Sequence, residues 1–181
     1  MLNLLKTVYA YKLSVYTYKG FVKMHDISST PDELAVVGDC CAAFNVRKAS
    51  RVITRLYAEA FAPVGIEPTQ FMLLAACARQ GTVTMGALAT KMSMDPSALA
   101  RNVTILERRG LVRIAPGADR RARDVSISAK GRNTLSRALP RWREVQAKLA
   151  GQIGEDSFRS AVELMKGIVR SGEALLDHSI S

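Results

Sequence analysis

Residues 95–128 of this chain read DPSALARNVTILERRGLVRIAPGADRRARDVSIS, and this stretch decides the fold. Asp95 can cap the unpaired amide groups at a helix start, and Pro96 suits the first helical position. Gly110 is a typical helix stop. The sequence therefore predicts a helix that begins after Asp95 and closes at Gly110.

Two short strands are predicted behind this helix. Apolar and polar residues alternate at Val112–Ile114 and again at Val125–Ile127, as is typical of half-buried strands. Pro116 and Gly117 begin the turn between them, and arginines crowd the rest of that turn. We therefore predict a β-hairpin with a basic tip.

The flanking sequence indicates further helices. Apolar residues recur at three- and four-residue steps in each, and Pro or Gly stands at the ends. Thr84 can cap the short helix that follows it. The predicted elements are a helix over about 45–62, a helix that begins after Pro68-Thr69 and stops at Gly81, an extended connector over 82–84, a helix over 85–92, and C-terminal helices to about His178, with a kink at Pro140 and a division at 151–154.

Two short helices joined by a tight turn, the second followed by a basic hairpin, form a winged helix-turn-helix, which places one helix in the DNA major groove. The predicted fold class is mainly α with a small β-hairpin. We divide the chain into an N-terminal extension (1–30), an N-terminal dimerisation helix region (31–65), the winged helix-turn-helix DNA-binding domain (66–128) and C-terminal dimerisation helices (129–181).

The proposed recognition helix has an inner and an outer face. Leu99, Val103 and Leu106 share one face by helical spacing and should point into the core. Arg can bridge guanine O6 and N7, Asn can pair with adenine, and Ser or the free amides of a helix start can hold a phosphate. The residues expected nearer the outer face are Ser97, Ala98, Arg101, Asn102 and Thr104, and Thr84 joins the candidate DNA-binding residues. Arg108 and Arg109, at the far end, are expected to be solvated or to interact with the helix dipole.

The hairpin tip carries Arg120, Arg121 and Arg123. Such a tip can enter the narrow minor groove, whose negative potential attracts guanidinium groups. Asp119 can orient a neighbouring arginine through a bidentate ion pair. The alternative is that these residues are solvated loop charges. We favour the wing because the tip directly follows a matching recognition helix.

Composition favours a polyanionic partner. The chain has 26 Lys and Arg against 16 Asp and Glu, a formal charge of +10. The only histidines, His25 and His178, lie at opposite ends. This argues against a Cys/His metal cluster and against a histidine-dependent catalytic triad.

Three cysteines do not make a disulfide framework, so the sequence favours a reducing, cytoplasmic location. Cys40 and Cys41 stand ahead of the first long helix and its basic residues. Positive charge and a helix start both lower a thiol pKa, so one of these cysteines is a candidate redox sensor. The alternative reading is small packing residues near a dimer interface. Cys77, within an apolar helix, is expected to be inert.

The first 24 residues differ in character from the rest. Lysines and tyrosines interrupt their apolar residues, unlike a signal peptide or a membrane span. We favour Met24 as the natural start, with residues 1–23 an upstream translation artefact. The alternatives are a basic interfacial helix, and an extra arm that packs on the domain or stays loose.

These residues resemble the multiple-antibiotic-resistance-regulator (MarR) family of bacterial transcription factors. The similarity runs from about Val37 to Leu175. It is most specific in Asp95-x-Ser97-x-x-x-Arg101, in Leu106-Glu-Arg-Arg-Gly110-Leu-Val112, and in Asp119-Arg-Arg-x-x-x-Val125-x-Ile-Ser128-x-x-Gly131. The chain departs from the family pattern at Pro96, Ala98 and Ala100, and these departures bear on the operator sequence more than on DNA binding.

The resemblance implies a homodimer formed by the terminal helices, two winged lobes and a palindromic operator. It places Ser97, Ala98, Arg101 and Asn102 at major-groove positions and the tip residues at the wing. Members of the family often release DNA when a small aromatic or phenolic molecule binds, and some respond to cysteine oxidation. No cofactor or metal is implied.

A dimer is also expected from the residues themselves. One helix and one wing read too few bases for useful selectivity, and the apolar stripes of both terminal segments exceed what a small winged lobe can cover. An extended monomeric core is the alternative. The leading hypothesis is thus a dimeric, effector-responsive regulator that acts as a repressor. The alternatives are a winged-helix protein-interaction or RNA-associated module, and an enzyme, which no catalytic constellation supports.

Overall fold

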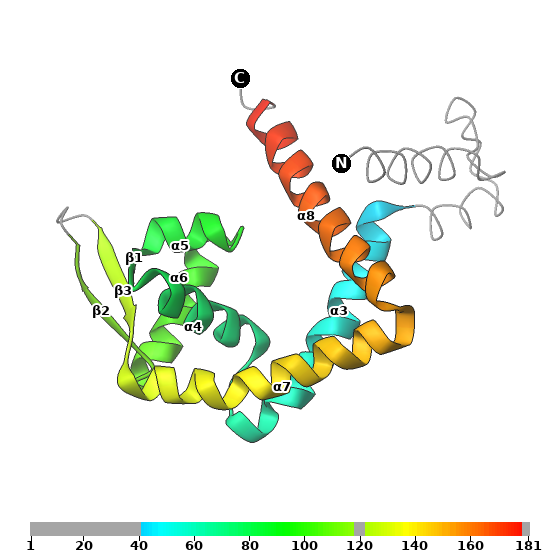
Figure 1. Ribbon diagram of the computed structural model, residues 1–181. Coiled ribbons are helices and arrows are strands. Elements are labelled where there is room, and N and C mark those ends of the chain that lie inside the picture. Colours follow the sequence, from blue (N-terminus) through cyan, green and yellow to red (C-terminus); the bar gives the residue numbers. More distant parts are fainter. Residues whose placement is uncertain (1–40, 118–121, 179–181) are drawn as a thin grey trace, which may run out of the picture. The chain divides into compact units, whose positions relative to one another are not determined.

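The computed structural model describes residues 41–117 and 122–178. The chain divides into two units, residues 1–50 and 51–181. Helix α3 (Ala42–Phe61) begins in the first unit and ends in the second, which contains all the other described elements (Figure 1). The predictions for residues 1–40, including the start at Met24, lie outside the described residues.

Three helices begin at the predicted signals. Helix α4 (Pro68–Gln80) starts with its proline and stops at Gly81, whose φ of +76° favours glycine. Helix α5 (Met85–Lys91) is capped by the Thr84 hydroxyl, which accepts a hydrogen bond from the amide of Ala87 at 3.1 Å. Helix α6 (Pro96–Arg108) starts behind Asp95. The predicted starts of α5 and α6 are confirmed, and α4 begins two residues earlier than predicted, at Pro68 itself.

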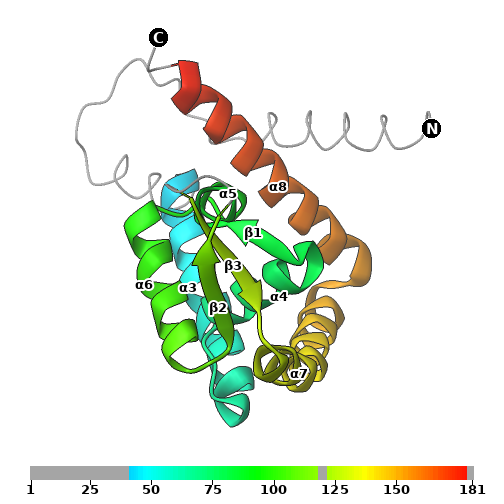
Figure 2. The same ribbon diagram turned by 90° about the vertical axis from the view of Figure 1, so that its left-hand side faces the viewer.

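The β-structure is larger than the predicted hairpin. Strands β2 (Val112–Pro116) and β3 (Arg123–Ile127) form that hairpin, and the expected connector is a third strand, β1 (Thr82–Thr84). The strand order is β1-β3-β2, and both pairings are antiparallel (Figure 2). A three-residue segment is too short to show the alternation that predicts a strand or its pairing. The pairing of β1 with β3 is therefore found only in the structure.

Helices α4, α5 and α6 pack with the three strands around one apolar core, and we call this assembly the winged lobe. Because α6 turns its apolar side inward, it contacts α4, α5 and β2. The side chains that anchor the core are at most 2% exposed: Leu73, Leu74, Cys77, Leu88, Leu99, Val103, Leu106, Leu111 and Val125.

The end of α3 is joined to the winged lobe by aromatic stacking. The chain turns through the short 3₁₀ helix η1 (Ala62–Val64) and Gly65 before α4 begins. The buried ring of Phe61 stacks on Tyr57 at 5.8 Å and on Phe71 of α4 at 4.7 Å between ring centroids. This stack holds the turn between the two helices in place. Burial also raises the pKa of the Tyr57 hydroxyl.

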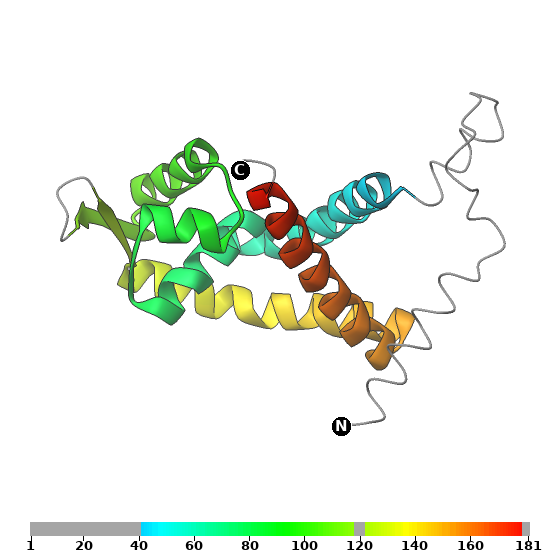
Figure 3. The same ribbon diagram turned by 90° about the horizontal axis from the view of Figure 1, so that it is seen from above.

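Two long helices follow the sheet. Helix α7 (Ala129–Ile153) continues through Pro140, and Gly154, with φ +86°, separates it from α8 (Glu155–His178). The division predicted at 151–154 is confirmed, and the kink predicted at Pro140, which lies inside α7, stays a prediction. Figures 1 and 3 show α7 leaving the sheet end of the winged lobe and leading to α8.

No single described helix is both long and apolar enough to cross a membrane. Residues 42–64 and 68–80 pass that test only when taken together, and they meet at a bend of 73°.

The start of α7 is held against the end of α6 by an unusually close backbone contact. A Cβ atom on Gly131 would lie 2.0 Å from the carbonyl oxygen of Leu111 and 2.8 Å from Cγ1 of Ile127. Ser128 links the same parts, because its hydroxyl donates to the Gly110 carbonyl at 2.6 Å and accepts from the Gly131 amide at 2.9 Å. Only glycine fits at position 131.

We predict that Gly131→Ala destabilises the protein by at least about 2 kcal/mol, because the added methyl group overlaps backbone that cannot move without shifting β2. Urea unfolding followed by circular dichroism measures this. Gly151→Ala in the same helix is the matched control. Nothing lies within 4 Å of its added Cβ, so it should be neutral or slightly stabilising. Equal stability of both variants would contradict the packing account.

Candidate nucleic-acid interface

The start of α6 is fixed by one carboxylate. Oδ1 of Asp95 accepts hydrogen bonds from the amide of Ser97 at 2.8 Å, from the amide of Ala98 at 3.1 Å and from the hydroxyl of Ser97 at 2.5 Å. The Ser97 hydroxyl, followed by the two amides, holds the pKa of the Asp95 carboxyl below its usual range. The carboxylate thus occupies the anion position at the helix start.

This arrangement refines the prediction that Ser97 or the first amides hold a phosphate. Those donors already serve Asp95 in this structure, so a phosphate would have to displace the carboxylate. The Ser97 oxygen also accepts a hydrogen bond from Nη1 of Arg101 at 3.4 Å. The contacts therefore assign Ser97 a role in orienting Arg101 on the exposed side of the helix.

The two predicted faces of α6 are confirmed. Leu99, Val103 and Leu106 are at most 1% exposed. Ser97 and Arg101 are exposed, whereas Ala98, Asn102 and Thr104 are half-buried. Nδ2 of Asn102 donates to the carbonyl oxygen of Ala98 at 2.9 Å, so this amide must turn before it can reach a base. Among the predicted base-reading residues of α6, Ser97 and Arg101 are therefore the exposed ones, and Arg101 is the one that carries a charge.

The turn between α5 and α6 is tight. Ser93 has a φ of +45°, the only positive φ of a non-glycine residue in the described part of the chain. The Ser93 amide donates to the carbonyl of Thr90, and the Met94 amide donates to that of Ala89. These bonds set the angle between the two helices. Thr84, at the start of α5, is exposed, and its hydroxyl oxygen serves as the helix cap.

The hairpin carries the second part of the candidate interface. The β2–β3 pairing runs from Val112 opposite Ile127 to Pro116 opposite Arg123, and the amide of Gly117 donates to the carbonyl of Ala122. Arg123 is exposed at the start of β3. The predicted tip residues Asp119, Arg120 and Arg121 lie outside the described residues. Figures 1 and 3 show β2 and β3 extending from the same lobe that presents α6.

The positive charge of this region is not neutralised by ion pairs among the described residues. All ion pairs within 41–117 and 122–178 lie on α7 and α8, for example Lys148 with Glu144 at 2.8 Å and Lys166 with Glu163 at 2.7 Å. Arg101 and Arg123 keep their charge available for a polyanion. In the same ranges, no three His, Cys, Asp or Glu side chains gather closely enough to hold a metal ion.

The side-chain contacts of Arg109 differ from the expectation that Arg108 and Arg109 are solvated or interact with the helix dipole. Its Nη1 donates to Oε1 of Gln70 at 3.0 Å, and its Nη2 donates to the carbonyl of Gly65 at 2.5 Å. Gln70 is only 5% exposed. A glutamine within an apolar helix was the one sequence signal for this contact, since a buried amide needs a partner.

The two described cysteines have different surroundings. Cys77 is 1% exposed, and burial raises the pKa of its thiol, as expected for an inert core residue. Cys41 is half-buried and directly precedes α3. Cys40 lies outside the described residues.

Comparison with known proteins identifies the family. Residues 64–122 match a family model described as "MarR family". The chain is 24% identical over 110 residues to the HTH-type transcriptional repressor MdtR of Bacillus subtilis, and this match covers 60% of the chain and 71% of MdtR.

Two solved structures of the Mycobacterium tuberculosis transcriptional regulator MosR are also similar. The one in complex with DNA is 34% identical with a TM-score of 0.64, covering 72% of this chain and 98% of MosR. The other is 31% identical with a TM-score of 0.68, covering 76% and 98% respectively. Together with the winged lobe described above, these matches show that the chain belongs to the MarR family of transcriptional regulators.

Proposed function

We propose that this protein is a homodimeric repressor that binds a palindromic operator in double-stranded DNA. The proposal rests on the two faces of α6: a buried apolar stripe anchors the helix, and the exposed Arg101 belongs to the same lobe as a hairpin with exposed Arg113 and Arg123. The regulatory relatives support it, since MdtR is named a repressor and one MosR structure contains DNA. A regulator of this kind needs no catalysis.

Within this proposal, α6 enters the major groove and the hairpin follows the adjacent minor groove. Arg101 reads guanine, and Asn102 reads adenine once its amide leaves the carbonyl of Ala98. Ser97 and Ala98 line the approach of the helix. The remaining contacts are assigned to Thr84, Asp119, Arg120, Arg121 and Arg123, with Asp119 orienting Arg121 as it enters the groove.

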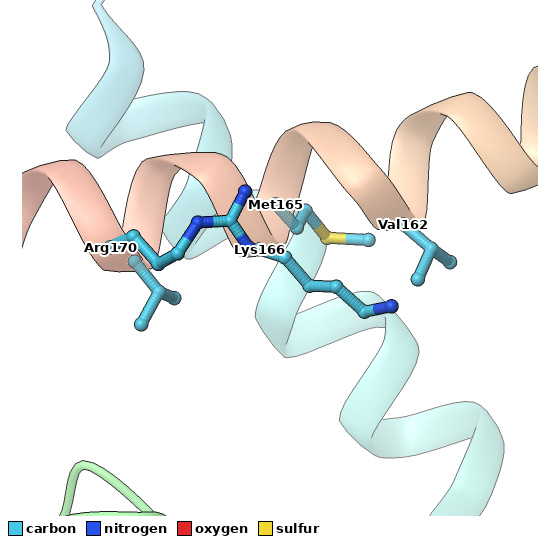
Figure 4. A pocket seen from close by; sticks show the side chains of 5 residues that line it. Val162, Met165, Lys166 and Arg170 are labelled. Carbon is cyan, nitrogen blue, oxygen red and sulfur yellow. The ribbon is translucent and has the colours of Figure 1, made fainter.

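Dimerisation is supported by an apolar stripe on α8. Leu164, Met165, Ile168 and Val169 are each 46–56% exposed, and Leu176 is 66% exposed. Helical spacing places them on one side, where Val162, Met165 and Val169 line a shallow hollow with Lys166 and Arg170 (Figure 4). A continuous exposed apolar stripe marks an interaction surface, and a second copy of the chain is the partner we assign to it.

The signal that releases DNA is proposed to be either a small aromatic or phenolic molecule or oxidation of Cys40 or Cys41. The cytoplasm is the proposed location, where both signals and the operator are accessible. Neither route uses Cys77, because it lies in the core of the winged lobe.

The first prediction concerns sequence reading. A duplex selected from random DNA by the wild-type protein serves as operator, and scrambled DNA is the competitor. Arg101→Ala should weaken operator binding by about 1–3 kcal/mol, the value of a base contact, and relax specificity. Arg143→Ala removes the same charge from the exposed surface of α7 and should leave specificity unchanged. Selection of no preferred sequence would refute the function, and equal behaviour of the two variants would refute the role of Arg101.

The second prediction concerns the wing. Arg121→Ala should lower operator affinity several-fold, because one guanidinium leaves the minor groove, and binding of the wild type should weaken steeply with salt. Titrations at a series of salt concentrations measure both. A variant that binds as tightly as wild type at every concentration contradicts the wing assignment.

The third prediction concerns the dimer. Val169→Glu places a charge in the apolar stripe and should shift the protein from dimer to monomer in sedimentation velocity. Ala174→Glu is the matched control, because helical spacing puts this exposed residue on the other side of α8. Val169→Glu remaining dimeric would exclude the stripe as the interface.

The fourth prediction concerns the cysteines. If peroxide releases the operator, Cys77→Ser should respond like wild type, because the buried thiol with its raised pKa reacts slowly. The double variant Cys40→Ser, Cys41→Ser should lose the response. The opposite pattern in gel-shift titrations would contradict the assignment.

A further inference from the structure

Two adjacent arginines at the end of α6 have different surroundings. The side chain of Arg108 is exposed and makes no hydrogen bond or ion pair within the described ranges. Arg109 instead directs both of its terminal nitrogens to acceptors on another part of the fold, Oε1 of Gln70 and the carbonyl oxygen of Gly65. The guanidinium of Arg109 is thus committed to uncharged protein atoms.

The acceptors of Arg109 both belong to residues 62–70, which comprise the turn between α3 and α4 and the first three residues of α4, and which we call the elbow. Oε1 of Gln70 also accepts a hydrogen bond from the Glu67 amide at 3.2 Å, so one buried oxygen holds the elbow together and receives the guanidinium. Phe61 and Phe71 stack across the same turn. The elbow is therefore held together by its own contacts and binds the Arg109 side chain at the end of α6.

The other side of the helix end is fastened to α7. Nζ of Lys130 donates to the carbonyl oxygen of Arg109 at 2.8 Å, and the Ser128 hydroxyl donates to the carbonyl oxygen of Gly110. Arg109 thus lies between the elbow at the end of α3 and the start of α7. The elbow directly follows α3, and Lys130 lies in the first turn of α7. Arg109 therefore contacts the two segments that connect the winged lobe to the long helices.

We propose that Arg109 is a positioning residue for DNA recognition: its planar fork fixes the direction of α6 relative to the end of α3. This inference rests on the function proposed above, in which the long helices join two copies and each α6 reads one half-site. Arg109 then sets the separation of the two recognition helices while making no contact with DNA. A planar guanidinium that donates to two fixed acceptors resists rotation of the helix. A lysine ammonium on a flexible side chain does not.

The distance between half-sites gives the most direct test. Each base pair inserted between half-sites changes their separation and rotates one about the DNA axis, so a rigid dimer binds the altered duplex more weakly. We define the spacer penalty as the affinity for the selected operator divided by that for the same operator with one added base pair. The fraction of folded protein cancels in this ratio, so a loss of stability alone does not change it.

Arg109→Ala should lower operator affinity by on the order of tenfold, comparable to losing one hydrogen bond from a charged donor, and should reduce the spacer penalty several-fold. Arg108→Ala is the matched control. It removes the same charge one residue earlier and should keep the wild-type spacer penalty. Both variants should bind scrambled DNA equally.

Two further variants test the fork and its partner. Arg109→Lys keeps the charge but not the fork, so its spacer penalty should match that of Arg109→Ala. Gln70→Met removes the acceptor at similar side-chain volume and should also reduce the spacer penalty. The double variant Gln70→Met, Arg109→Ala should have nearly the same spacer penalty as Arg109→Ala alone. Full rescue by lysine, or additive effects of the two substitutions, would overturn the proposal.

Other outcomes separate this inference from the proposed function. If the wild type selects an operator but Arg109→Ala keeps the full spacer penalty, the positioning role is wrong and the repressor function stands. If Arg109→Ala weakens binding to all DNA alike and lowers the salt dependence by one phosphate contact, Arg109 binds DNA directly and the inference fails. Selection of no operator refutes the proposed function itself.

Discussion

The backbone of Gly131 lies directly against the carbonyl oxygen of Leu111, and the arrangement of α6, the sheet and α7 depends on this contact. It allows the Ser128 hydroxyl to bridge the end of α6 and the first turn of α7. Helix α6 is therefore held at its C-terminal end by backbone packing, and at its N-terminal end by the Asp95 carboxylate. With both ends held, the exposed side chains of α6 project from a fixed frame.

Local rules explain how much of this fold is predictable. The start of α6 follows from Asp95 and Pro96, and its inner face follows from the spacing of Leu99, Val103 and Leu106, because these signals act within a few residues. The third strand is not predicted because β1 pairs with β3, whose partner residues lie 40 to 44 positions further along the chain. Such a pairing depends on the assembled core, and three residues carry no periodicity from which to infer it.

The candidate site shows the same limit in its charged residues. Arg101 and Arg108 lie on α6 and Arg109 directly follows it, and from the sequence we expect solvation or a dipole interaction for the last two. The fold separates them: Arg101 hydrogen-bonds to Ser97, Arg108 is exposed, and Arg109 reaches a buried glutamine far away in sequence. Helical spacing identifies which residues face outward, but only the tertiary structure identifies which of them find a protein partner.

Guanine N7 methylation interference on an operator selected by the wild-type protein measures whether α6 enters the major groove, because N7 lies on the floor of that groove. We expect methylation to block binding at guanines in two symmetric patches about one helical turn apart, one for each α6 of the dimer. Binding that is indifferent to N7 methylation, or blocked in a single patch, would contradict this expectation.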